Sequence, residues 1–182
     1  MSMKNTLEIY FQKQREYWQE KYQTFPQMPY SKAIDERMIV KDSLKDGYIQ
    51  WQPIHQNNTV DFTALERKLN ISIHPRIKEY FTSFWFLSMV GTIKGNILRF
   101  TAVPYGISII DLVNESYRWG STNFVENKKQ FEFGFAKIGN DDSYLLYVDN
   151  DTASIRCIQL EENIELHLGD LDKVISKMEV IR

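Results

Sequence analysis

The chain has 182 residues, of which 43% are hydrophobic, and 22 basic against 24 acidic side chains give a formal net charge of −2. This length and apolar content predict one globular domain over residues 1–182. The near-neutral charge provides no field that would attract phosphates, which argues against nucleic-acid binding. One cysteine excludes an internal disulfide and is typical of a reducing cytoplasm. Without a secretory signal or a run of ~20 apolar residues, we expect a cytoplasmic protein that reaches the membrane only through a partner.

The first part of the chain predicts a long amphipathic helix. Leu7, Phe11 and Trp18 recur at helical spacing over residues 4–23, and Pro26 ends the pattern. The following residues, 25–47, are rich in proline, aspartate and glycine and predict an irregular connection with a short strand at 38–40. Alternating aromatic and polar side chains then predict a strand over residues 48–53.

The central stretch predicts two helices and a strand. Asp61 is suited to cap a helix over residues 62–69, and Pro75 is suited to the first turn of a second helix ending near residue 84. Residues 84–90 are too apolar for water and too short to cross a membrane, so we expect a buried strand there.

The second half of the chain predicts a strand-rich region between two helices. Its turns are rich in glycine, asparagine and aspartate. The expected elements are a turn at 91–95, a strand at 96–103, a helix at 107–118, a loop at 120–131, strands at 133–138, 143–148 and 154–160, and a helix at 170–180. Hairpin-linked strands with flanking helices predict an α+β fold whose sheet is mixed or mostly antiparallel.

No motif in the sequence predicts catalysis, a metal or a cofactor. The three histidines lack metal-ligand spacing, and no glycine-rich loop fits a phosphate. Cys157 and His167 could be a nucleophile and its base, but Cys157 lies within a predicted strand, where a buried thiol is the usual role. The run from Asp149 to Thr152 starts like a calcium loop but lacks its later glycine and glutamate, so a turn is the better interpretation. We therefore expect a non-enzymatic protein.

Acidic side chains are concentrated between residues 138 and 172. The segment contains nine acids and one basic residue, Arg156, and so has a net charge of −8, which leaves +6 for the rest of the chain. Such a segment is either a set of solvated turns or an acidic surface that binds a basic partner.

Several stretches, in this order, resemble the Syd family of SecY-interacting proteins, within the wider SUKH superfamily. They are the aromatic first helix with Trp18, the segment FPQMPYSKAIDE, the Trp51-Gln52-Pro53 strand end and the segment ALERKLNISIHPRIKEYFTSFW. The resemblance extends over nearly the whole chain, and its second half is less distinctive. It implies an α+β binding protein with no enzymatic activity.

The resemblance also implies a partner. Syd proteins dock on the cytoplasmic face of the SecY translocon, where an acidic surface receives basic loops, so we expect peripheral association with the inner membrane. SUKH-type immunity proteins, which neutralise a toxin by binding it, remain the alternative. The residues that we assign to partner binding are one tryptophan expected to be exposed and nine acids: Trp51, Asp35, Glu36, Glu66, Asp141, Asp142, Asp149, Asp151, Glu161 and Glu162.

Overall fold

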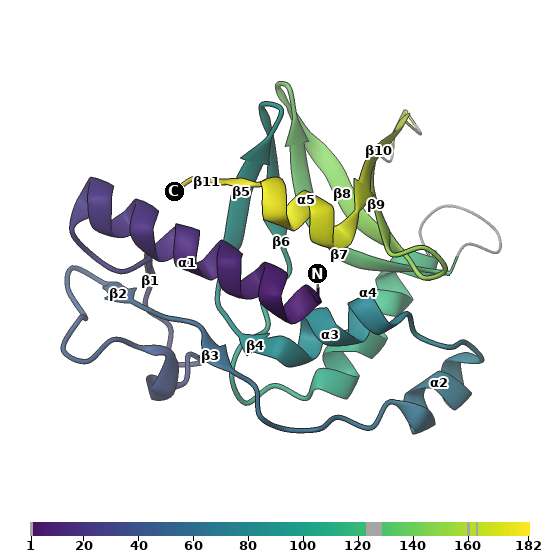
Figure 1. Ribbon diagram of the computed structural model, residues 1–182, viewed down its shortest axis with the longest axis horizontal. Coiled ribbons are helices and arrows are strands. Elements are labelled where there is room, and N and C mark those ends of the chain that lie inside the picture. The colour runs from purple at the N-terminus through teal and green to yellow at the C-terminus, as the bar shows by residue number, and fades with distance from the viewer. Residues whose placement is uncertain (1, 123–128, 160, 163) are drawn as a thin grey trace.

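The computed structural model describes residues 2–122, 129–159, 161–162 and 164–182 (Figure 1). The elements of the first half are α1 (Met3–Tyr22), β1 (Gln27–Pro29), the 3-10 helix η1 (Glu36–Met38), β2 (Tyr48–Gln50), β3 (Ile54–His55), α2 (Thr63–Leu69), α3 (Pro75–Ser83), β4 (Phe84–Trp85), β5 (Met89–Ile93) and β6 (Asn96–Phe100). Those of the second half are α4 (Ile109–Thr122), β7 (Gln130–Ile138), β8 (Asp141–Asp149), β9 (Ser154–Gln159), β10 (Ile164–Asp170), α5 (Leu171–Lys177) and β11 (Glu179–Val180).

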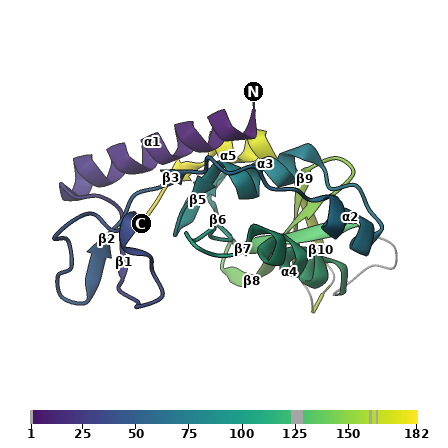
Figure 2. The same ribbon diagram turned by 90° about the horizontal axis from the view of Figure 1, so that it is seen from below.

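Seven of the strands form one antiparallel sheet in the order β10-β9-β8-β7-β6-β5-β11. The pairs β1–β2 and β3–β4 stand apart from it. Figure 2 shows the β1–β2 pair under the C-terminal half of α1, at the other end of the molecule from α2. The expected α+β class with a mostly antiparallel sheet is confirmed.

The helix α1 begins and ends as its sequence predicts. The Ser2 hydroxyl accepts a hydrogen bond from the Asn5 N–H, and Gln23 closes the helix in a left-handed conformation (φ 56°). The Tyr10 hydroxyl donates to the Val90 carbonyl and accepts from the Val90 N–H, which ties α1 to β5. The helix therefore has a fixed position against the sheet.

Aromatic rings from α3 and β7 meet in the core. Tyr80 and Phe81 lie 4.6 Å and 5.2 Å from the ring of Phe133, and all three are fully buried. Burying side chains of this size contributes about 1.5–3 kcal/mol each. The predicted helices around Asp61 and Pro75 are confirmed, and Asp61 accepts a hydrogen bond from the Thr63 N–H, in the first turn of α2.

Three local predictions are wrong at least in part. Residues 36–38 form η1, because Asp35 accepts a hydrogen bond from the Arg37 N–H, and of the strand expected at 38–40 only Ile39 forms a bridge, to Trp51. Gly91 lies inside β5, where β11 pairs so closely that a Cβ at Gly91 would be 2.7 Å from the Glu179 carbonyl oxygen. The helix α4 continues through Gly120 to Thr122, and β10 lies over residues for which no element was predicted.

Candidate partner-binding surfaces

The nine acids assigned to partner binding do not share one face. They lie in four places: beside η1, between α2 and α3, at the sheet end formed by the β7–β8 and β9–β10 turns, and at the β8–β9 turn at the opposite end. Antiparallel strands alternate in direction, so every second turn falls at the same end of the sheet. This separation could not be derived without the strand order.

Four of these acids gather at one end of the sheet, along its upper edge in Figure 1. Asp141 and Asp142 begin β8, Glu161 and Glu162 follow β9, and the antiparallel pairing of β8 with β9 places both pairs at the same end of the sheet. Within the described ranges none of the four has an ion pair. We call Asp141, Asp142, Glu161 and Glu162 the acidic sheet end.

Asp149 is occupied by contacts that build the β8–β9 turn. Its Oδ1 accepts hydrogen bonds from the Asp151 and Thr152 N–H groups and from the Thr152 hydroxyl. Its Oδ2 lies 3.3 Å from a guanidinium nitrogen of the buried Arg156. The predicted turn is confirmed, and only Asp151 of its two acids is exposed.

Glu66 and Asp35 also hold local structure. Glu66 Oε1 accepts from the Ile73 N–H at 2.7 Å and from the Lys78 ammonium at 2.8 Å. Burial alone would raise the pKa of Glu66, but these two hydrogen bonds lower it below its usual value. The Arg37 guanidinium, hydrogen-bonded to Asp35, holds the pKa of Asp35 at about 2. Glu36, next to it, is exposed.

Trp51 is fully buried, so the expectation that it is exposed is wrong. The backbone explains this, because the Trp51 N–H donates to the Pro26 carbonyl and residue 51 bridges to Ile39. Pairing on both sides turns the indole beneath α1. Trp51 therefore lies beneath the surface and is not an exposed contact residue.

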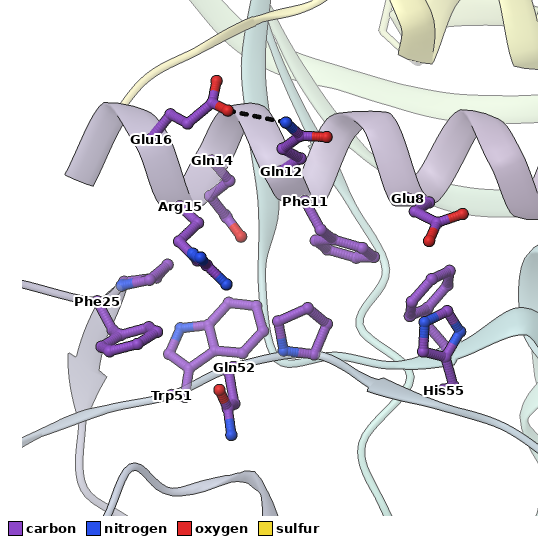
Figure 3. A pocket seen from close by; sticks show the side chains of 13 residues that line it. Glu8, Phe11, Gln12, Gln14, Arg15, Glu16, Phe25, Trp51, Gln52 and His55 are labelled. Carbon is purple, nitrogen blue, oxygen red and sulfur yellow. Dashed lines mark hydrogen bonds between the residues drawn. The ribbon is translucent and has the colours of Figure 1, made fainter. Parts of the chain in front are cut away.

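The indole lies at the floor of a groove of about 400 Å³ between α1 and residues 51–55 (Figure 3). Polar side chains and Phe11 of α1 line one side, and the rings of Phe25, Pro26, Pro53 and Phe84 line the other together with Gln52 and His55. Its lining residues are Glu8, Phe11, Gln12, Gln14, Arg15, Glu16, Phe25, Pro26, Trp51, Gln52, Pro53, His55 and Phe84.

One buried polar atom in this groove has no partner. The Gln14 side chain donates to the Ser88 carbonyl, but its Oε1 has no hydrogen-bond partner among the described residues and points toward Trp51 in Figure 3. An acceptor left without a donor in a buried site is unfavourable, so the groove suits a ligand or water that brings a donor.

The polar residues of this groove were not predicted from the sequence. Glu8, Gln12 and Glu16 recur every four residues, which places them along one stripe of α1, and that spacing could have revealed them. The position of His55 had no such signal. Its ring stacks on Phe84 at 4.3 Å only because β3 pairs with β4.

Cys157 and His167 lie on opposite faces of the sheet. Cys157 is fully buried and pairs with Leu166, whereas His167, the next residue along β10, is 69% exposed. The two side chains do not meet as a nucleophile and its base. Burial also raises the pKa of Cys157 to about 12, so the thiol stays protonated at neutral pH.

We expect Cys157 to react with Ellman's reagent at pH 8 at least about 100-fold more slowly in the folded protein than in denaturant. A shift of three pKa units lowers the thiolate fraction about a thousandfold, and burial also blocks the reagent. Absorbance at 412 nm (the product's band) would measure both rates. Equal rates in the two conditions would contradict the buried position.

Among residues 2–122, 129–159, 161–162 and 164–182, no three His, Cys, Asp or Glu side chains come together as metal ligands would. None of the helices there combines the length and apolar character needed to span a membrane.

Comparison with known proteins gives two matches. The family model for the Syd protein (SUKH-2) matches residues 4–103, which run from α1 past the end of β6 and include every residue that lines the groove. The Protein Syd of Aeromonas hydrophila subsp. hydrophila is 25% identical over 142 residues, which cover 77% of this chain and 76% of that protein. The first match covers more than half of the chain, and the chain therefore belongs to the Syd family.

Proposed function

We propose that this chain is a non-enzymatic binding protein that docks on the cytoplasmic face of the SecY translocon. Its place in the Syd family carries the proposal. Docking would hold the protein at the cytoplasmic side of the inner membrane through SecY alone.

The contact that we propose is between the acidic sheet end and basic loops of SecY. Six of the nine predicted acids are exposed and have no ion pair among the described residues, and these four, unlike Glu36 and Asp151, lie together at one end of the sheet. Asp35, Glu66 and Asp149 are already bound to Arg37, Lys78 and Arg156. Carboxylates that are free of intramolecular pairs attract a basic loop without first breaking a contact.

We expect the combined change Asp142→Asn, Glu161→Gln and Glu162→Gln to weaken binding to SecY in lipid nanodiscs by about 3–150-fold, since each exposed charge contributes about 0.2–1 kcal/mol. Asp141 is left in place because it accepts hydrogen bonds from Ser143. Biolayer interferometry at low and high salt would measure the affinity, which should fall as salt rises.

The matched control changes three exposed acids elsewhere, Glu20→Gln, Asp111→Asn and Glu179→Gln, and so alters the net charge equally. If wild type does not bind SecY, the proposed partner is wrong. If it binds and both triple variants lose equal affinity, SecY is the partner but the acidic sheet end is not the contact.

A further inference from the structure

A large aromatic side chain is exposed in the middle of the sheet. Phe135 lies on β7, pairs with Arg99 on one side and Leu145 on the other, and is 55% exposed. Among the described residues its ring makes no ring–ring or cation–π contact. A central strand normally buries such a residue, so an exposed one marks a candidate interaction surface.

Two cations flank this ring on the same face. Arg99 pairs directly opposite Phe135, and Lys137 follows two residues further along β7 opposite Ile97, so alternation places all four side chains on one side of the sheet. Arg99 and Lys137 are exposed, and in the described part of the chain neither side chain has an ion pair or hydrogen bond. We call Ile97, Arg99, Phe135 and Lys137 the basic sheet face.

The positive charge continues past this face. A hollow of about 290 Å³ is lined by the four residues with Ala136 and Asp142, and Arg99 also lines a second hollow of about 210 Å³ under α1. The charged residues of the second hollow are Arg99 and Arg182, beside the rings of Trp18, Tyr48 and Trp51. The two hollows together are thus lined by three cations and one acid, Asp142, in a chain whose net charge is −2.

We propose that the basic sheet face docks an acidic protein segment that carries an apolar side chain. The unpaired cations select a segment of negative charge, and Phe135 with the half-buried Ile97 provides the apolar contact. A broad sheet face with two shallow hollows fits an extended segment better than a compact small molecule. The charge of this surface is opposite to that of the acidic sheet end, so the proposal does not depend on SecY binding.

The test is fluorescence anisotropy of the full chain with a short labelled peptide in which glutamates flank one phenylalanine. Two altered peptides accompany it, one with lysine for glutamate and one with alanine for phenylalanine. We expect the first peptide alone to bind tightly, and its affinity to fall as salt rises. Vesicles of phosphatidylglycerol and phosphatidylcholine serve as a different anionic partner.

We expect the double change Arg99→Gln and Lys137→Gln to weaken binding of the acidic peptide at least about tenfold, and Phe135→Ala to weaken it about fivefold. Because these side chains are exposed, circular dichroism and the melting temperature should stay close to wild type. The charge control is Lys4→Gln with Lys32→Gln, two exposed cations elsewhere, and should change affinity less than about twofold.

The proposal is overturned if wild type does not bind the acidic peptide or binds the lysine peptide as tightly. It is also overturned if the double variant binds like wild type, or if anionic vesicles bind while the acidic peptide does not. Loss of SecY binding in the nanodisc experiment leaves this result unaffected, because the two experiments test surfaces of opposite charge.

Discussion

Replacing Arg156 with alanine is expected to lower the free energy of unfolding by about 3–5 kcal/mol, because it leaves acids without their cation. Arg156 is 5% exposed, and its guanidinium lies 2.9 Å from a Glu165 carboxylate oxygen and 3.3 Å from one of Asp149. It also donates to the Gln130 side chain at 3.0 Å. One buried cation therefore joins β7, the β8–β9 turn and β10.

Urea unfolding followed by circular dichroism would measure this effect. Arg67→Ala, an exposed arginine on α2, is the control and should change stability by less than about 0.5 kcal/mol. Arg156→Met should also destabilise the protein, and adding Asp149→Asn to it should recover part of that loss. The amide removes one uncompensated charge and keeps the acceptor oxygen of the turn. If Arg156→Ala unfolds at the same urea concentration as wild type, the cation does not stabilise the sheet.

Replacing Gly134 with alanine is expected to destabilise the protein by about 3–5 kcal/mol, through backbone strain and a steric clash. Gly134 follows an irregularity in β7, where the pairing with β8 shifts between residues 132 and 134. Its φ is +131°, and a Cβ would overlap the carbonyl oxygen of Arg99 on β6. The β6–β7 pairing would have to separate to accept the methyl group.

Gly139 provides the matched comparison for this substitution. Its φ is +61°, but a Cβ there would meet no atom within 4 Å. Gly139→Ala should therefore cost only about 1–2 kcal/mol, the strain of a left-handed residue without a clash. Thermal and urea unfolding of both variants would separate the two contributions. Equal losses at both positions would mean that close approach of β6 contributes nothing.

Local sequence patterns were sufficient for the helices α1, α2 and α3 and for the hairpin strands. Each of these depends on neighbours within a few residues, such as Ser2 at the start of α1 or Pro75 at the start of α3. The strands β10 and β11 lacked such a signal. Their residues extend because they pair with the free edges of β9 and β5, and for β11 that edge is distant in the sequence.

Sequence alone determined the fold class and the charge of the segment from residue 138 to 172, because composition and local periodicity contain that information, and the resemblance of its segments indicated the family. The positions of the predicted site residues did not follow from the sequence. Strand order placed Asp141 and Asp142 at the same end of the sheet as Glu161 and Glu162, strand register placed Phe135 beside Arg99, and Asp149 pairs with the buried Arg156. A shift of one residue would turn every side chain to the opposite face, so only the tertiary structure decided which charges are exposed, which are paired and which lie together.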